Sequence, residues 1–110
     1  MRRVEKPWGH EIVWAETDRY VGKILHIAKG QSLSRQYHKK KDETFLVQTG
    51  HMDLEVGQGA ELEVLKMGPG DAFHCAPNTV HRMVAATDVD VIEVSTPELD
   101  DVVRLEDAYG

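Results

Sequence analysis

Short hydrophobic segments fill this chain, and glycines or acidic residues separate them. Within 52–56, for example, three apolar residues alternate with two acidic ones. A period of two is typical of a β-strand with one face in the core and one in water. No segment has the 3.6-residue period of a persuasive helix. The pattern predicts strands at 11–14, 20–27, 32–38, 43–49, 52–56, 61–65, 72–75, 80–85, 89–94 and 102–105.

Turn residues divide these segments at close intervals, at Gly30, Gly50, Gly57-Gln58-Gly59 and Gly68-Pro69-Gly70. Many short strands joined by turns predict an all-β protein, either a sandwich or a barrel. With 110 residues, the chain is expected to form a single domain, 1–110, whose core needs no disulfide or structural metal.

Composition excludes several classes of protein. The net charge of -6 argues against nucleic acid as a partner, because nucleic-acid binding needs a basic surface. The single Cys75 cannot form an intramolecular disulfide, and no segment resembles a signal peptide or a membrane helix. We expect a cytoplasmic protein with no membrane partner. The basic run at 39–41 is interpreted as a solvated turn.

The residues with the most chemical content are Gln36, His38, Glu43 and His81. Gln36 and His38 are two apart on a predicted strand, so their side chains share a face at a spacing of about 6 to 7 Å. The polar residues 39–42 suit a tight hairpin connection, after which Glu43 returns to face this pair. Two imidazoles, a carboxylate and an amide oxygen, without a thiolate, suit one divalent ion: Zn first, then Mn, Fe, Co or Ni.

The same residues lie within a longer pattern that resembles the two motifs of cupins. The pattern reads Gly30-x5-Gln36-x-His38-x4-Glu43-x6-Gly50 and Gly70-Asp71-x4-Ala76-x-Asn78-x2-His81. Gln-x-His at the start of the first motif is similar to the phosphomannose isomerase branch, as is the opening Lys6-Pro7-Trp8-Gly9. The segment 99–110 is similar to the end of the cupin domain in bifunctional guanylyltransferase and mannose-6-phosphate isomerase enzymes. The resemblance implies a jelly-roll β-barrel, or double-stranded β-helix.

Three positions depart from the family pattern. Ala76 and Asn78 replace a proline and a glycine of the second motif, and Lys41 replaces an arginine of the bifunctional enzymes. The first two changes should leave the fold intact, because Pro77 still restricts the turn and asparagine tolerates left-handed dihedrals. The third bears on activity, since lysine offers a point charge to a substrate phosphate or enediolate oxygen where arginine offers a planar fork.

The resemblance implies an aldose to ketose isomerisation, in which a metal polarises a carbonyl and stabilises an enediolate. A base must move the proton, and Glu93, Lys23, His26 and His74 are candidates. Strand alternation leaves open which of Lys23 and His26 faces inward. From these bases we select Glu93 and Lys23 as catalytic candidates. Two further candidates come from the family pattern: Lys41, and Arg82, which follows His81 as an arginine does in the isomerase branch. Alternation nevertheless places Arg82 on the face opposite His81.

Four aromatic residues could line a sugar pocket, because sugars stack on aromatic rings: Trp8, Trp14, Tyr20 and Tyr37. For the two tryptophans, packing in the core or at the end of the barrel is the preferred interpretation. Cys75 is interpreted as a small buried hydrophobic residue, since nothing adjacent would depress its pKa.

The sequence therefore favours a metal-dependent sugar-phosphate isomerase, and the resemblance implies that the reaction interconverts mannose 6-phosphate and fructose 6-phosphate. Two alternatives remain open: a non-catalytic module that binds a sugar or nucleotide sugar, and a metal-dependent dioxygenase. The expected partners are a phosphorylated sugar and a second copy of the chain, because in cupins of this kind a segment such as 1–9 often crosses to a dimer partner.

Overall fold

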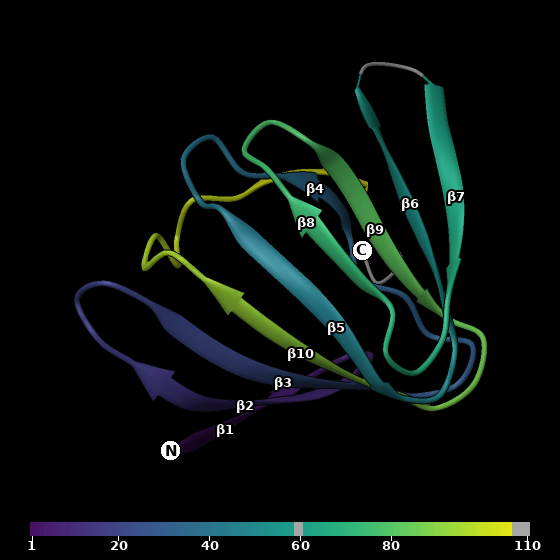
Figure 1. The fold of residues 1–110 in the computed structure, drawn as a ribbon, viewed down its shortest axis with the longest axis horizontal. Helices are drawn as coiled ribbons and strands as arrows, with labels where there is room; N and C mark the ends of the chain where they lie inside the picture. Colours follow the sequence, from purple (N-terminus) through teal and green to yellow (C-terminus); the bar gives the residue numbers. More distant parts are fainter. Residues whose placement is uncertain (59–60, 107–110) are drawn as a thin grey trace.

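A computed structural model describes residues 1–58 and 61–106 and shows an all-β protein, as predicted (Figure 1). Its strands are β1 (Arg2–Lys6), β2 (Gly9–Glu16), β3 (Val21–Ile27), β4 (Arg35–Tyr37), β5 (Glu43–Thr49), β6 (Met52–Gln58), β7 (Glu61–Met67), β8 (Ala72–Cys75), β9 (Val80–Ala85), β10 (Val89–Ser95) and β11 (Val103–Glu106). No helix in the described part of the chain is long and apolar enough to cross a membrane.

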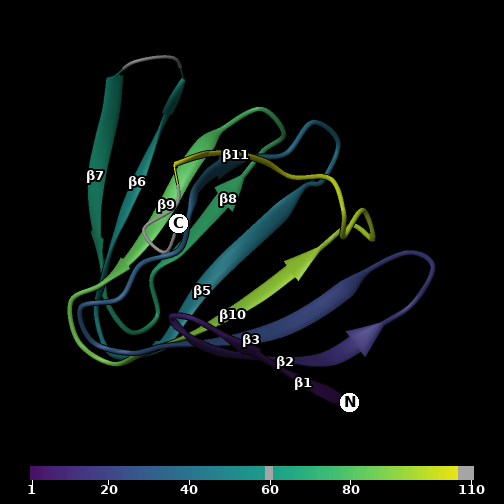
Figure 2. The same cartoon turned by 180° about the vertical axis from the view of Figure 1, so that it is seen from behind.

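The strands form two antiparallel sheets that face each other (Figures 1 and 2). The larger sheet has the order β1-β2-β3-β10-β5-β8, and the smaller sheet has the order β11-β4-β9-β6-β7. Some neighbours in each sheet are far apart in sequence, such as β3 beside β10 and β4 beside β9, because the chain crosses repeatedly from one sheet to the other. This arrangement is the jelly roll, or double-stranded β-helix, that the motifs implied.

The core lies between the two sheets and consists of the alternate apolar residues of the predicted pattern. Phe45, Ile27, Leu54, Val89 and Val91 have no measurable exposure. Each of these side chains contributes about 1.5 to 3 kcal/mol through removal of apolar surface from water. The alternation predicted for 52–56 is confirmed, with its three apolar residues buried and its two acidic residues partly exposed.

Each of the ten predicted strands overlaps an observed one, and their ends differ in physically understandable ways. The strand predicted at 32–38 is shortened to β4, and Ser32 forms an isolated bridge with Val84. The turn predicted at 57–59 is wrong for Gly57 and Gln58, which continue β6 opposite β7. Cross-strand pairing has overridden their turn propensity here, and Gly59 lies outside the described residues.

The strand β1 was not predicted, because its residues are mostly charged. It pairs with β2 of the same chain, with Arg2 opposite Val13 and Lys6 opposite Gly9. The turn between them depends on Gly9, where φ is 150° and a Cβ atom would lie 2.0 Å from the carbonyl oxygen of His26. The segment thus has an internal partner, contrary to the impression from sequence. The predictions that segment 1–9 crosses to a second subunit and that the protein is a homodimer stay predictions.

The hairpin expected around residues 39–42 is wrong. β4 belongs to the smaller sheet and β5 to the larger one, so this connection crosses from one sheet to the other. β5 pairs instead with β10 and β8, which aligns its apolar inner face with theirs. Glu43 therefore faces His38 across the interior of the sandwich and not along a shared hairpin.

Candidate metal centre

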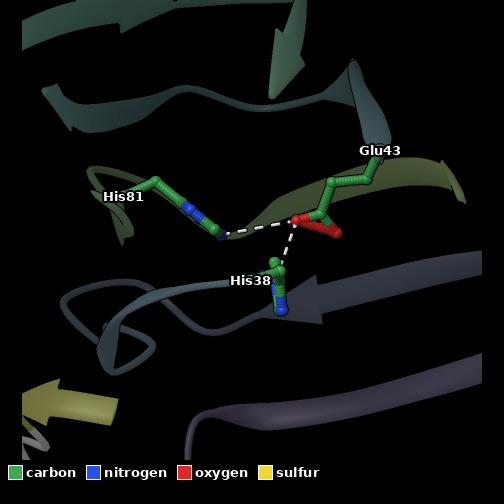
Figure 3. A group of neighbouring side chains, drawn as sticks. All are labelled: His38, Glu43 and His81. Atoms are coloured by element: carbon green, nitrogen blue, oxygen red, sulfur yellow. Dashed lines mark ion pairs between the residues drawn. The ribbon is translucent and has the colours of Figure 1, made fainter. Parts of the chain in front are cut away.

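Three buried side chains from the two sheets meet in the interior (Figure 3). His38 follows β4, Glu43 begins β5 and His81 lies in β9. Glu43 Oε2 lies 3.1 Å from His38 Nε2 and 3.4 Å from His81 Nε2. The two motifs are joined directly, since the backbone N–H of Asn78 donates to the carbonyl oxygen of His38. Asn78 has a φ of 67°, which confirms that asparagine can replace the motif's glycine.

The backbone orients both imidazole rings. Nδ1 of His38 hydrogen-bonds the carbonyl oxygen of Asp101, and Nδ1 of His81 hydrogen-bonds the carbonyl oxygen of Thr79 at 3.0 Å. Because a carbonyl can only accept, each Nδ1 carries a proton, and in the neutral ring Nε2 is the nitrogen that keeps its lone pair. Both lone pairs are directed to the side of Glu43, the arrangement that supports histidine as a metal ligand.

The donor set fits a divalent cation on two observations. Nε2 of His38 and Oε2 of Glu43 are buried without a hydrogen-bond partner among the described residues, while Oε1 of Glu43 faces the ammonium of Lys41 at 3.2 Å. Such orphaned atoms are costly unless something binds them. In addition, two ligands about 2.1 Å from one ion at angles of 90 to 110° lie about 3.0 to 3.4 Å apart, which agrees with the two distances to Glu43 Oε2. The nitrogen and oxygen donors suit Zn, Mn, Fe, Co or Ni.

Gln36 lies beside this cluster. Its Cα is paired with that of His81 across β4 and β9, and its side chain lines the same cavity. The carbonyl oxygen Oε1 accepts a hydrogen bond from the hydroxyl of Ser34 at 3.1 Å, which still leaves it one lone pair. The role of Gln36 as a fourth ligand stays a prediction.

The electrostatics keep the cluster ready for a cation. Burial alone would raise the pKa of Glu43, but its interactions with His38 and Lys41 outweigh burial and lower the pKa to about 2. Burial lowers the pKa of His81, so its imidazole is neutral at pH 7. Burial is also the largest single influence on His38 and acts in the same direction, but the interactions with Glu43 and with the backbone of Asp101 together outweigh it and raise the pKa. A charged carboxylate beside a neutral imidazole is what a metal requires.

A cavity of about 380 Å³ opens beside the cluster. Glu93 and Lys23 both line it, which resolves the orientations that alternation had left open. His26 lies on the outer face of its sheet, where its Nδ1 is 2.7 Å from Asp90. His74 is exposed and pairs with Asp42 outside the cavity. Of the four candidate bases, the structure thus brings Glu93 and Lys23 to the metal centre.

Lys41 is buried, so interpreting it as part of a solvated turn was wrong. Its ammonium lies 3.2 Å from Glu43 and 3.9 Å from Glu93 at the inner end of the cavity. Burial alone would lower the pKa of Lys41, but these two carboxylates raise it, so the side chain stays charged. Burial, together with repulsion from Glu43, raises the pKa of Glu93 to about 7 despite Lys41.

Arg82 lies on the face of β9 that points away from the metal centre, as alternation predicted. Its guanidinium pairs with Glu55 at 3.1 Å and with Glu106 at 3.6 Å. Arg35 also reaches Glu55, at 2.9 Å. This position corrects the choice of Arg82 as a catalytic candidate and makes it part of an ion-pair network that joins β4, β6, β9 and β11.

That network makes stability depend on pH. Burial alone would raise the pKa of Glu55, but hydrogen bonds from Arg82 and Arg35 lower it below its ordinary value of 4.5. The stabilisation is therefore present above pH 4.5 and lost as the pH falls toward the folded pKa.

We expect Glu55→Gln to reduce the free energy of unfolding by about 1 to 2 kcal/mol at pH 7, with a smaller difference below pH 4. Denaturant titrations across this range measure it, with exposed Glu16→Gln as control. If the difference in free energy of unfolding between wild type and Glu55→Gln does not change with pH, the ionised Glu55 is not the source of this stabilisation.

Asp101 holds the connection that carries Lys41. Its carboxylate accepts hydrogen bonds from three consecutive backbone N–H groups, those of residues 39, 40 and 41, at 3.2, 2.6 and 2.9 Å. The backbone carbonyl of the same residue bonds His38. The segment before β11 thus positions the stretch of chain between His38 and Glu43.

We expect Asp101→Ala to weaken metal affinity by about 10- to 100-fold, because groups that orient ligands affect affinity nearly as much as ligands do. Titration of the metal-free protein with Zn measures the effect. Asp100→Ala is the matched control, since no side-chain hydrogen bond of Asp100 is found among the described residues. Equal affinities in the two variants would show that the carboxylate of Asp101 does not support the site.

Sequence reasoning missed three charged residues that line the cavity: Lys6, Glu11 and Arg104. Glu11 Oε1 lies 3.4 Å from the ammonium of Lys23, and both side chains are largely buried. The signal for Glu11 was present, because it alternates with Val13 on the inner face of β2. Lys6 belongs to the unpredicted β1, so no signal placed it.

The aromatic residues divide between core and surface. Trp8 is buried and lines the cavity, as expected for packing in the core. Trp14 is 47% exposed and lies over Gly22 on the outer face of the sheet, so core packing was wrong for it. Tyr20 is also exposed. Cys75 is buried, as predicted, and burial raises the pKa of its thiol to about 12.

Fold and site together define a double-stranded β-helix protein with a possible His, Glu and His metal site between its sheets. The chain belongs to the Cupin domain family, whose sequence profile matches residues 23–96.

Several known proteins are similar to this chain. Over 116 residues the chain is 34% identical to mannose-1-phosphate guanylyltransferase of Escherichia coli K12, covering 99% of this chain and 23% of that protein. KdgF from Halomonas sp. has a TM-score of 0.80 at 24% identity, with 91% of each chain covered. Streptomyces PAC13 with uridine also has a TM-score of 0.80, at 14% identity over 96% of this chain and 84% of that one. The structural matches support the fold alone, and the chain spans about a quarter of the length of the curated relatives it matches.

Proposed function

We propose that this protein is a metal-dependent sugar-phosphate isomerase that interconverts mannose 6-phosphate and fructose 6-phosphate. The observation that carries the proposal is the position of Glu93, a buried carboxylate beside the metal centre in a cavity of about 380 Å³. That volume is within the range of small-molecule sites. The similarity to a mannose-1-phosphate guanylyltransferase supports a phosphorylated sugar as the class of substrate.

The chemistry divides between the metal centre and the neighbouring acid-base residues. A divalent ion held by His38, Glu43 and His81, with Gln36 as a fourth ligand, would polarise a carbonyl and stabilise negative charge on its oxygen. Glu93 takes the proton from C2 of the open-chain aldose and returns it to C1, the former carbonyl carbon, while the hydroxyl proton passes from O2 to O1, which converts aldose to ketose. Ser95 pairs with Glu43 across β10 and β5, so Glu93 is a diagonal neighbour of Glu43 on the same inner face.

Two lysines hold Glu93 in place. The ammonium of Lys41 lies within ion-pair distance of both Glu93 and Glu43. Lys23 is paired with Glu93 across β3 and β10 and is anchored on its other side by Glu11. These cations favour the charged carboxylate that can accept a proton, while burial favours the neutral acid that can return it.

The test is a coupled assay for fructose 6-phosphate formed from mannose 6-phosphate, with Zn, Mn, Co, Ni and Fe supplied in turn. Deuterium from solvent should also enter the carbon next to the carbonyl wherever the abstracted proton exchanges with water. Product formation is measured in parallel, because complete internal transfer would leave no deuterium signal. If neither product nor exchange appears with any of the five metals, the isomerase proposal fails.

One observation favours a second function, a binding module without turnover. Lys41 lies within ion-pair distance of two carboxylates, so its charge is neutralised inside the protein. A site of this kind could retain a sugar phosphate and yet lack a free cation for the enediolate oxygen. Binding of mannose 6-phosphate by calorimetry, without product in the coupled assay, would favour this function.

A further inference from the structure

Four cationic side chains line the cavity, and they divide into two pairs. Lys23 lies 3.4 Å from Glu11, and Lys41 lies 3.2 Å from Glu43. Both of these ammonium groups are largely buried, so their charges are balanced by carboxylates of the protein itself. Neither is available as the main partner of an anionic substrate group.

Lys6 and Arg104 differ from the inner pair. Neither has a carboxylate partner among residues 1–58 and 61–106. Lys6 is partly buried on β1, and Arg104 is exposed on β11. These are the edge strands of the larger and the smaller sheet, and both side chains line the same cavity. The structure thus places two uncompensated cations where the cavity meets solvent, on a chain whose net charge is -6.

Strand register sets the distance from this cationic end to the metal centre. Arg104 is paired with Gln36 across β11 and β4, and Gln36 is paired with His81 across β4 and β9. Arg104 is therefore two strands from His81, or about 10 Å at the usual spacing between strands. Since paired residues share a face, all three side chains lie on the inner face of the smaller sheet.

We propose that Lys6 and Arg104 form an anion-binding pair that holds the phosphate of a sugar phosphate while its carbonyl end reaches the metal centre. The placement of the carbonyl end at the metal centre rests on the proposed function. The placement of the phosphate rests on the two cations alone. Arginine offers a planar fork that fits two phosphate oxygens, and lysine adds a point charge. The separation favours a short chain with an anion at one end, and the small cavity favours a phosphate monoester over a nucleotide sugar.

The test compares Lys6→Gln/Arg104→Gln with Lys29→Gln/Arg19→Gln, which removes the same charge from two exposed side chains outside the cavity lining. Isothermal titration of the metal-loaded proteins uses mannose 6-phosphate, inorganic phosphate and GDP-mannose as ligands. We expect the first double variant to raise the Kd for mannose 6-phosphate and for phosphate by about 10- to 100-fold. The control should stay within about twofold of the wild type, and metal content and melting temperature should be unchanged in both.

An unchanged Kd for mannose 6-phosphate in the Lys6→Gln/Arg104→Gln variant would overturn the proposal, as would a wild type that binds neither phosphate ligand. Tighter wild-type binding of GDP-mannose than of mannose 6-phosphate would overturn the assignment to a monoester. The proposed function fails separately. If the protein turns over mannose 6-phosphate and the Lys6→Gln/Arg104→Gln variant has an unchanged KM, the anion-binding pair is refuted and the isomerase proposal stands. If binding depends on Lys6 and Arg104 but no turnover is found, the anion-binding pair stands and the isomerase proposal is refuted.

Discussion

The double variant His38→Ala/His81→Ala is expected to lose its divalent ion. The wild type should carry about one ion per subunit, and the variant should fall to background, because two of its three buried donors are removed. Only Glu43 and Gln36 would remain as ligands, and two protein ligands are too few to retain the ion. Elemental analysis after gel filtration in metal-free buffer measures the content.

The matched control is His26→Ala/His74→Ala, which removes two histidines outside the cavity and should retain the ion. Because His38 and His81 are buried, circular dichroism must show that the first variant still folds. Glu43→Gln provides a second route, since it keeps the shape of the side chain but removes the charge. Undiminished metal in both His38→Ala/His81→Ala and Glu43→Gln would refute the site.

Glu93→Gln is expected to lower kcat for the isomerisation by about 100- to 10,000-fold, the usual contribution of a positioned acid-base group. Glutamine has nearly the same volume, and its carbonyl oxygen can still face the ammonium of Lys41, so the packing should be kept. It cannot take up a proton. The coupled assay with mannose 6-phosphate measures turnover, and elemental analysis should show that metal content is unchanged.

Glu63→Gln is the control for this change, since Glu63 is exposed on β7, away from the cavity. It should leave kcat within about twofold of the wild type, as surface substitutions usually do. A Glu93→Gln variant with full turnover would remove Glu93 as the base. Lys23 would then become the preferred candidate, because it is the other candidate base that lines the cavity.

The fold was predictable from sequence because alternation is a local property. A half-buried strand needs an apolar residue at every second position, and that requirement is visible in 52–56 without any knowledge of its partners. The candidate ligands were predictable for a related reason. Gln36 and His38 share a face wherever the strand lies, and turn residues identify the strand ends near Glu43 and His81. The charged β1 was missed because its pairing with β2 is not encoded as a hydrophobic pattern.

Only the tertiary structure decided how the faces meet. Strand alternation places Lys23 and His26 on opposite faces. It does not determine which face points inward, because that depends on the position of the other sheet. For the same reason the sequence predicts a hairpin between β4 and β5, although they belong to different sheets. Lys41 looked like part of a solvated turn, yet the crossing between the sheets draws it inside, where two carboxylates stabilise its charge. The sequence by itself determined strands, faces and donor types. The packing of the two sheets decided which charges face one another, since those contacts join residues far apart in the chain.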